Sequence, residues 1–280
     1  MVGIYVINMD RDKERLERAS QRLGDSGYRM IRVSGTDVSK EDVSMYHTGN
    51  APKGVVGCSI SHLKILEAFV RSPCSGPWIL IGEDDVIPLR HASELQEFMN
   101  RVPEDFDVVH LGCEFDCSSK SNLLQKSIGV ITVGPGYKSS APVSESVNRM
   151  HSFVGAHMYI ASRKGAKKIL EDIKNDRSVH IDKRIGKVPN IVIYSAASPF
   201  STTEITGLCT GSNIIGNSGV KRLFCWLDNI YITSTRTLGY ALFVKMNGLV
   251  PFSVFDCIVF LLFIYLMFRL FQRFGKSRSK

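Results

Sequence analysis

Several signals that often reveal a function are missing from this chain of 280 residues. It has no G-x-x-x-x-G-K-[ST] phosphate loop, which disfavours the P-loop class of nucleotide hydrolases. No segment repeats itself, which disfavours a repeat array. The opening segment, Met1 to Ile7, carries no basic stretch and no cleavage signal. We therefore expect no secretory leader, and a reducing compartment for the folded domain.

A zinc-binding cysteine pattern is also missing. The seven cysteines are an odd number, and Cys113-x3-Cys117 has neither a second cysteine pair nor a His-x3-His partner. Small buried thiols explain such cysteines more simply, so zinc at this pair is a weak hypothesis.

The net charge of +8 is concentrated at the C-terminal end of the chain. Five basic residues and no acid lie in the last twelve residues, and without these five the net charge would be +3. A terminal basic cluster beside an apolar run indicates anionic lipid head groups rather than nucleic acid, so we expect no nucleic-acid partner. The five residues are Arg269, Arg273, Lys276, Arg278 and Lys280.

The apolar run Leu249 to Phe268 is about long enough to cross a bilayer. Asp256 is costly inside lipid, so a segment lying in the membrane plane, a true span and a buried helix all stay open. We expect a membrane-associated protein whose folded domain is cytosolic. The predicted parts are a domain over 1–235, a linker over 236–248, an apolar helix over 249–269 and a basic tail over 270–280.

Apolar runs with the period of strands alternate with charged segments of helical period. This alternation predicts an α/β fold with a mixed, mainly parallel central sheet. A Ser- and Gly-rich stretch, 118–148, is expected to run over the surface as a long loop. The predicted strands are 3–8, 28–33, 78–81, 106–111, 153–161 and 190–196, and the helices are 11–22, 58–70, 92–100 and 164–173.

Three adjacent acids, Glu83, Asp84 and Asp85, follow the apolar strand 78–81. A hard divalent cation, Mn²⁺ or Mg²⁺, is the simplest way to relieve their mutual repulsion. Strand alternation lets Glu83 and Asp85 face the same way, so this pair is the candidate metal site. A solvated acidic turn is the alternative interpretation.

Two further groups of polar residues are candidates for chemistry. Ser61 and His62 follow a glycine-rich approach to a predicted helix, where free backbone N–H groups favour phosphate. The alternative is a helix-start hydroxyl and a structural histidine. Glu114, Asp116 and Asp182 are candidate general bases, and each is equally compatible with a surface acid or a helix cap.

These segments, in this order and spacing, resemble glycosyltransferase family 25, the lipopolysaccharide-type and procollagen galactosyltransferases. The resemblance spans roughly residues 3 to 210. It is carried by I-Y-V-I-N-M-D-R at 4–11, V-G-C-S-I-S-H at 56–62, I-L-I-G-E-D-D at 79–85, F-D-V-V-H-L-G at 106–112 and G-A-H-M-Y-I-A-S-R-K-G-A at 155–166.

The resemblance implies a GT-A-like nucleotide-binding fold and an inverting transfer of a hexose, galactose or glucose, from a UDP-sugar. It implies that Asp85, with Glu83, is the metal ligand. It places Asn8 and Arg15 at the nucleotide pocket, Gly35 and Asp37 near the base or ribose, and Ser61, His62 and Asp84 along the donor site. Asp182 matches an acid that follows the Ser-Arg-x-Gly-Ala helix of the family.

The acceptor implied by the resemblance is a glycan, a lipid-linked sugar or a protein hydroxyl. Residues 201–207 depart from the family pattern, which leaves the acceptor open. Two alternatives remain: a non-catalytic, membrane-tethered protein that binds nucleotide sugars, and another metal-dependent nucleotidyl or phosphoryl transferase.

Overall fold

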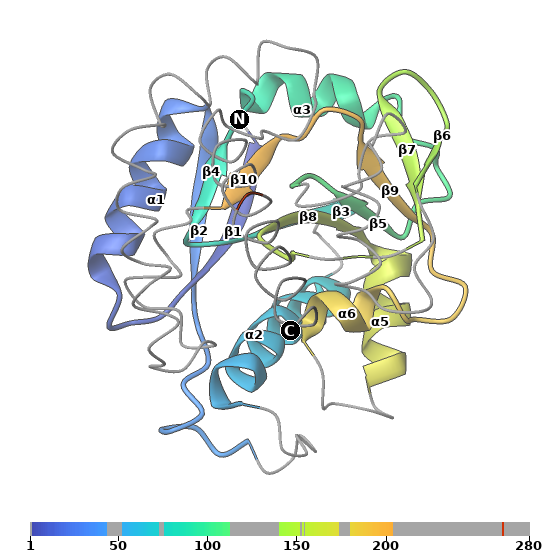
Figure 1. The fold of residues 1–280 in the computed structure, drawn as a ribbon. Coiled ribbons are helices and arrows are strands. Elements are labelled where there is room, and N and C mark those ends of the chain that lie inside the picture. The colour runs from blue at the N-terminus through green and yellow to red at the C-terminus, as the bar shows by residue number, and fades with distance from the viewer. Residues whose placement is uncertain are drawn as a thin grey trace, which may run out of the picture.

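The computed structural model describes residues 2–43, 52–72, 76–112, 140–151, 153, 155–173, 180–203 and 265. Within these residues the chain forms one large sheet with helices on both faces, as Figure 1 shows. The strands are β1 Val2–Asn8, β2 Tyr28–Ser34, β3 Trp78–Glu83, β4 Val86–Pro88, β5 Val108–His110, β6 Ala141–Pro142, β7 Val147–Met150, β8 Met158–Ser162, β9 Ile193–Ala196 and β10 Ser201–Thr203. The helices are α1 Lys13–Asp25, α2 Lys53–Arg71, α3 Ala92–Met99, α5 Arg163–Ile173 and α6 Ile181–Ile185.

The large sheet has the strand order β2-β1-β3-β8-β5-β9-β7-β6, and β10 pairs separately with β4. β1 runs parallel to β2 and β3, and β5 runs parallel to β9. The other four pairings, β3 with β8, β8 with β5, β9 with β7 and β7 with β6, are antiparallel. The predicted mixed α/β sheet is therefore confirmed.

The expected predominance of parallel pairs is wrong. The chain reverses direction in the β6–β7 hairpin, and β8 enters the centre of the sheet antiparallel to both of its neighbours. Parallel crossovers usually contain a helix, and the described residues between β6 and β8 contain none. The hairpin lies where the sequence indicated surface loop, and therefore the alternation of elements did not reveal it.

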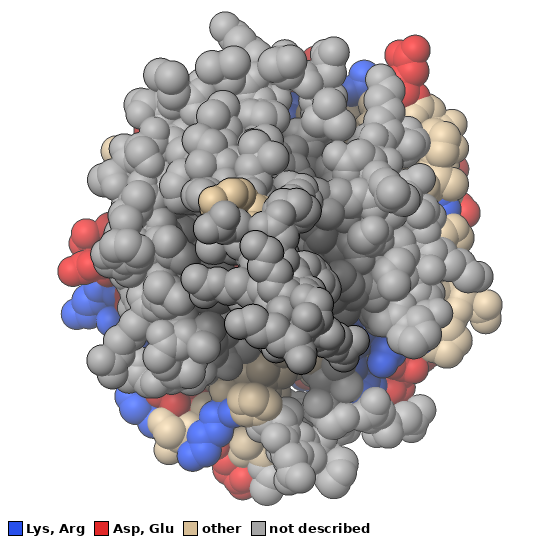
Figure 2. All heavy atoms as spheres, in the orientation of Figure 1, with Lys and Arg blue, Asp and Glu red and all other residues tan. Residues whose placement is uncertain are grey.

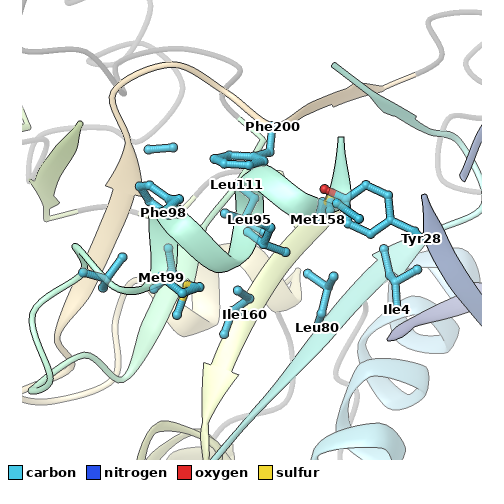
Figure 3. Packing of buried hydrophobic residues seen from close by; sticks show 14 of the residues in the cluster. Ile4, Tyr28, Leu80, Leu95, Phe98, Met99, Leu111, Met158, Ile160 and Phe200 are labelled. Carbon is cyan, nitrogen blue, oxygen red and sulfur yellow. The ribbon is translucent and has the colours of Figure 1, made fainter. Parts of the chain in front are cut away.

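Alternating burial explains how the sheet holds two apolar layers. One layer lies between the sheet and α2, α5 and α6, and includes Leu66, Tyr159 and Ile169. The other lies between the sheet and α1 and α3. There Phe98 and Phe200 lie side by side, as Figure 3 shows. Their ring centroids are 5.1 Å apart.

Where the described surface is visible in Figure 2, mainly around the rim of the view, acidic and basic side chains are interspersed. Of the predicted apolar helix over 249–269, only Tyr265 belongs to the described residues, and its backbone is helical. None of the helices in the described ranges is both long and apolar enough for a bilayer crossing. The four predicted chain parts and the membrane association remain predictions.

Candidate active site

The candidate site lies where three neighbouring parallel strands end. β1 finishes at Asn8, β2 at Ser34 and β3 at Glu83, and the parallel pairing brings these ends to one edge of the sheet. The Gly35 backbone N–H donates to the Asn8 carbonyl across this edge, at 2.9 Å. Ligands of open α/β sheets bind at such carboxyl ends.

Asp84 is held by side chains from β1 and α1. The Asn8 amide Nδ2 donates to Asp84 Oδ2 at 2.8 Å, and Arg15 makes an ion pair with Oδ1. Arg22 donates to the Asp84 carbonyl at 3.3 Å. Burial raises the pKa of Asp84, although the charge of Arg15 opposes this shift. Asp84 thus fastens the turn after β3 to the rest of the site.

Asp85 has the least favourable environment for a negative charge among the three adjacent acids, Glu83, Asp84 and Asp85. Its Oδ2 lies 3.4 Å from Arg15 Nη2, whereas its Oδ1 is buried and has no hydrogen-bond partner among the described residues. Burial, reinforced by the neighbouring Glu83 charge, raises the pKa of Asp85 to about 8. A carboxylate oxygen without a partner fits a cation ligand, because a bound cation favours the charged form.

Glu83 faces away from Arg15, toward α2. Its Oε1 lies 3.2 Å from His62 Nε2 and accepts from the Cys58 thiol at 3.8 Å. Burial opposes ionisation of Glu83, but the hydrogen bond and charge of His62 outweigh it and lower the pKa of Glu83. The pKa is lowered at Glu83 and raised at Asp85, so these two acids at the same strand end differ in how readily they ionise.

His62 is completely buried, and its other ring nitrogen is occupied as well. Nδ1 lies 3.1 Å from the Tyr159 hydroxyl on β8, and the two rings stack with centroids 5.6 Å apart. The tautomer of His62 determines which partner donates in each bond. Tyr159 and Cys58 therefore belong to the site, and neither was a predicted site residue.

The hydrogen bonds of the Ser61 hydroxyl indicate a structural role. Its hydroxyl donates to the Gly57 carbonyl at 2.7 Å and accepts from the Thr36 N–H at 2.8 Å. The reasoning that placed Ser61 and His62 at a helix start is wrong, because α2 begins at Lys53 and the two residues are its ninth and tenth. Their backbone N–H groups are not free for phosphate.

Of the remaining predicted site residues, Asp37 and Asp182 belong to the described residues. Asp37 accepts from the backbone N–H of Ser39 at 3.1 Å and pairs with Arg11 at 3.1 Å, and the hydroxyl and N–H of Ser39 lower its pKa. The Asp182 carboxylate, in the first turn of α6, accepts from the Gly155 N–H at 3.1 Å. Glu114 and Asp116 lie outside the described residues.

His157 lies behind Glu83, and its carbonyl accepts from the Glu83 N–H at 3.1 Å. Its buried ring faces His110, with centroids 5.9 Å apart. Burial, with the nearby His110, lowers the pKa of His157 to about 3, so this histidine is neutral at physiological pH. His157 belongs to the segment 155–166 that carries the family resemblance, but its place behind Glu83 is known only from the three-dimensional structure.

This fold and edge define a mixed α/β protein with an acidic strand end. A sequence model of glycosyltransferase family 25, described as LPS biosynthesis proteins, matches residues 1–185. The chain belongs to this family and is a glycosyltransferase. A search of curated proteins found no match.

Similar solved structures are distant. The chain is similar to a glycosyltransferase involved in glycosylation of the major capsid of PBCV-1, with 7% identity, a TM-score of 0.41, and coverage of 73% of this chain and 92% of that one. It is also similar to mouse xyloside xylosyltransferase 1, with 10% identity, a TM-score of 0.35, and coverage of 67% and 80%. A third similar structure is the galactosyltransferase LgtC in complex with donor and acceptor sugar analogs. The identity is 12% and the TM-score is 0.35, and the match covers 69% of this chain and 73% of that one. The family assignment depends on the sequence match.

Proposed function

We propose that this enzyme transfers a hexose, galactose or glucose, from a UDP-sugar to a hydroxyl acceptor, with inversion and with a required divalent cation. Glu83 and Asp85 would hold the cation, which is Mn²⁺ or Mg²⁺ because the donor atoms are carboxylate oxygens. When bound, such a cation supplies Lewis-acid stabilisation to a departing diphosphate. The family description favours a glycan or lipid-linked sugar as acceptor over a protein.

The main support for a bound cation is the buried Oδ1 of Asp85, which has no hydrogen-bond partner among the described residues. Leaving a buried carboxylate oxygen unpaired costs stability, and an apolar residue would avoid that cost. Arg15 provides the nearest positive charge, yet its ion pair with Asp84 is the closer of the two. Asp85 is therefore available for a cation, whereas Asp84 is committed to Arg15.

The residues around Asp85 support the binding of a nucleotide diphosphate. We assign Arg15 to the diphosphate, because its guanidinium already bridges two acids at the strand edge. Asn8 and Asp84 position that guanidinium, since Asn8 Nδ2 donates to the same carboxylate that Arg15 pairs with. Gly35 and Asp37, which follow β2 on the same edge, are assigned to the base or ribose.

With inversion, the acceptor hydroxyl attacks the anomeric carbon from the face opposite the departing diphosphate, so its general base is a carboxylate that lies near the site but faces the acceptor. Asp182 acts electrostatically on Cys58, as do Glu83 and Asp85, which supports a position near the strand edge. In the proposed reaction the acceptor oxygen forms a bond to the anomeric carbon and loses its proton to Asp182. The bond from that carbon to the diphosphate oxygen breaks, and UDP leaves.

The test is UDP release by the full chain from a panel of UDP-sugars with glycan acceptors, in Mn²⁺ and in EDTA. We expect release from one donor, lost in EDTA and reduced at least about a hundredfold in Asp85→Asn. Glu94→Gln on α3 is the matched control, because it makes the same chemical change away from the site. Asp182→Asn should slow transfer without weakening UDP-sugar binding.

Three outcomes contradict the proposal. Binding of UDP-sugars with no release under any condition supports the non-catalytic alternative. Equal release in Mn²⁺ and EDTA removes the metal requirement, and a normal rate in Asp85→Asn removes the assignment of Asp85.

A further inference from the structure

A second set of metal-ligating side chains lies beside the acidic strand end, and it has different chemistry. Cys58, His62 and Glu83 each direct one ligand atom inward, and these three atoms lie within 4.8 Å of one another. Sulfur and imidazole nitrogen suit softer ions than the carboxylate pair does. We propose that Cys58, His62 and Glu83 form a binding site for a thiophilic divalent cation of the Zn²⁺ type.

The spacing of the ligand atoms is close to that of a tetrahedral zinc site. His62 Nε2 and Glu83 Oε1 are 3.2 Å apart, and Cys58 Sγ and Glu83 Oε1 are 3.8 Å apart. With typical zinc bond lengths, tetrahedral ligands are separated by about 3.3 Å for nitrogen and oxygen and about 3.6 Å for sulfur and oxygen. Small side-chain movements would therefore suffice to bind the ion.

Two rigid elements present these ligands. Cys58 and His62 are four residues apart on α2, which places both on one face of the helix. Glu83 ends β3, whose backbone is held by pairing with β1 on one side and β8 on the other. Ligands on packed helices and strands hold their geometry better than ligands on loops.

The Tyr159 hydroxyl supplies the outer partner that a metal-binding histidine needs. It lies 3.1 Å from His62 Nδ1, and accepting a hydrogen bond from Nδ1–H would leave the Nε2 lone pair free for the ion. Tyr159 is fully buried, so its position is fixed. The carboxylates of Glu83 and Asp182 also act electrostatically on the Cys58 sulfur, and their negative charge attracts a cation.

The side chain of Glu83 is 28% exposed, and Cys58 is partly exposed, so an ion can reach the set from solvent. With three protein ligands, a tetrahedral ion keeps a fourth position for water or another ligand. The two proposed sites share Glu83, but the test of this one measures metal binding alone, so its failure is distinguishable from a failure of the proposed transfer reaction.

The test uses the full-length protein, stripped of metal by a chelator and titrated with Co²⁺ as a spectroscopic substitute for Zn²⁺. We expect a thiolate-to-cobalt charge-transfer band that saturates near one equivalent and disappears when Zn²⁺ is added. Cys58→Ser should abolish the band. Tyr159→Phe should keep it but weaken Co²⁺ binding about 10- to 100-fold.

Matched variants make the result specific to Cys58. The double variant Cys113→Ser and Cys117→Ser should keep the band, as should Asp85→Asn, in which only the carboxylate metal site is removed. Absence of the band in wild type overturns the proposal, because Cys58 and Glu83 would then form a hydrogen-bonded pair without a metal. Persistence of the band in Cys58→Ser also overturns it, and circular dichroism of each variant controls for folding.

Discussion

Arg15 Nη2 lies 3.4 Å from Asp85 Oδ2 while the same nitrogen makes a closer ion pair with Asp84. One guanidinium thus faces two adjacent acidic side chains just after the end of β3. Because these side chains are at most about one-fifth exposed, solvent screens the pairs only partly. The stability of the apo protein and its affinity for a cation should therefore depend on the same three residues.

Arg15→Met should destabilise the protein by about 3 kcal/mol, because it leaves the buried Asp84 carboxylate without its charge partner. Arg18→Met on the same helix is the control. Arg18 pairs with the exposed Glu14 at 3.8 Å, and such surface pairs contribute about 0 to 1 kcal/mol. Urea unfolding at neutral pH measures both variants, and equal losses would show that Arg15 is not a buried counter-ion.

The raised pKa of Asp85, about 8, gives the apo protein a specific pH dependence. Between pH 4 and 8 the unfolded chain has lost the Asp85 proton while the folded chain still holds it. Stability should therefore fall as pH rises through this window, by at most about 1.4 kcal/mol per pH unit from this group. In EDTA, wild type should lose stability relative to Asp85→Asn from pH 5 to 8, and Mn²⁺ should suppress the difference. A constant difference across that range would contradict the raised pKa.

The sequence predicted the strand edge of the site because the responsible pattern is local. An apolar run followed by three acids ends β3 at Glu83, as expected from the carboxyl-terminal position of ligand sites in α/β sheets. The partners of these acids come from far along the chain. Tyr159 meets His62 through a hydrogen bond between residues 97 apart, and no local pattern encodes that contact.

The start of α2 was mispredicted for a physical reason. Gly54 and Gly57 suggested a loose backbone before a helix at Cys58, yet both lie inside a helix that begins at Lys53. Gly57 is needed for packing, because a Cβ there would come within 2.5 Å of the Thr36 carbonyl oxygen. The glycine marks a close approach of the loop after β2, which the sequence alone does not distinguish from flexibility.

Gly57→Ala should accordingly destabilise the protein by about 1 to 3 kcal/mol, since the backbone of the Thr36 loop would have to move. Gly24→Ala in α1 is the matched control, because a Cβ at Gly24 meets no atom within 4 Å. There the better helix propensity of alanine should stabilise by about 0.5 to 1 kcal/mol. Thermal unfolding should show midpoints shifting in opposite directions, and a stabilised Gly57→Ala would refute the close approach.

Asp107 belongs to the family-like motif 106–112, and its contacts indicate a structural role. It is completely buried, and its Oδ2 accepts from the Val192 N–H at 2.8 Å and from Lys168 Nζ at 2.6 Å. Lys164 lies 3.4 Å from the other oxygen. This one carboxylate therefore joins α5 to the segment that enters β9.

Asp107→Ala should cost about 3 to 5 kcal/mol, because it leaves a buried N–H unpaired and removes the partner of Lys168. Asp107→Asn keeps an acceptor for Val192 but loses the charge, so a smaller loss, about 1 to 2 kcal/mol, is expected. Lys164→Met, which removes the exposed and more distant lysine, should change stability by less than about 1 kcal/mol. Urea unfolding ranks the three variants. If UDP release per folded molecule also fell in Asp107→Asn, the motif aspartate would have a role in the reaction rather than in the fold.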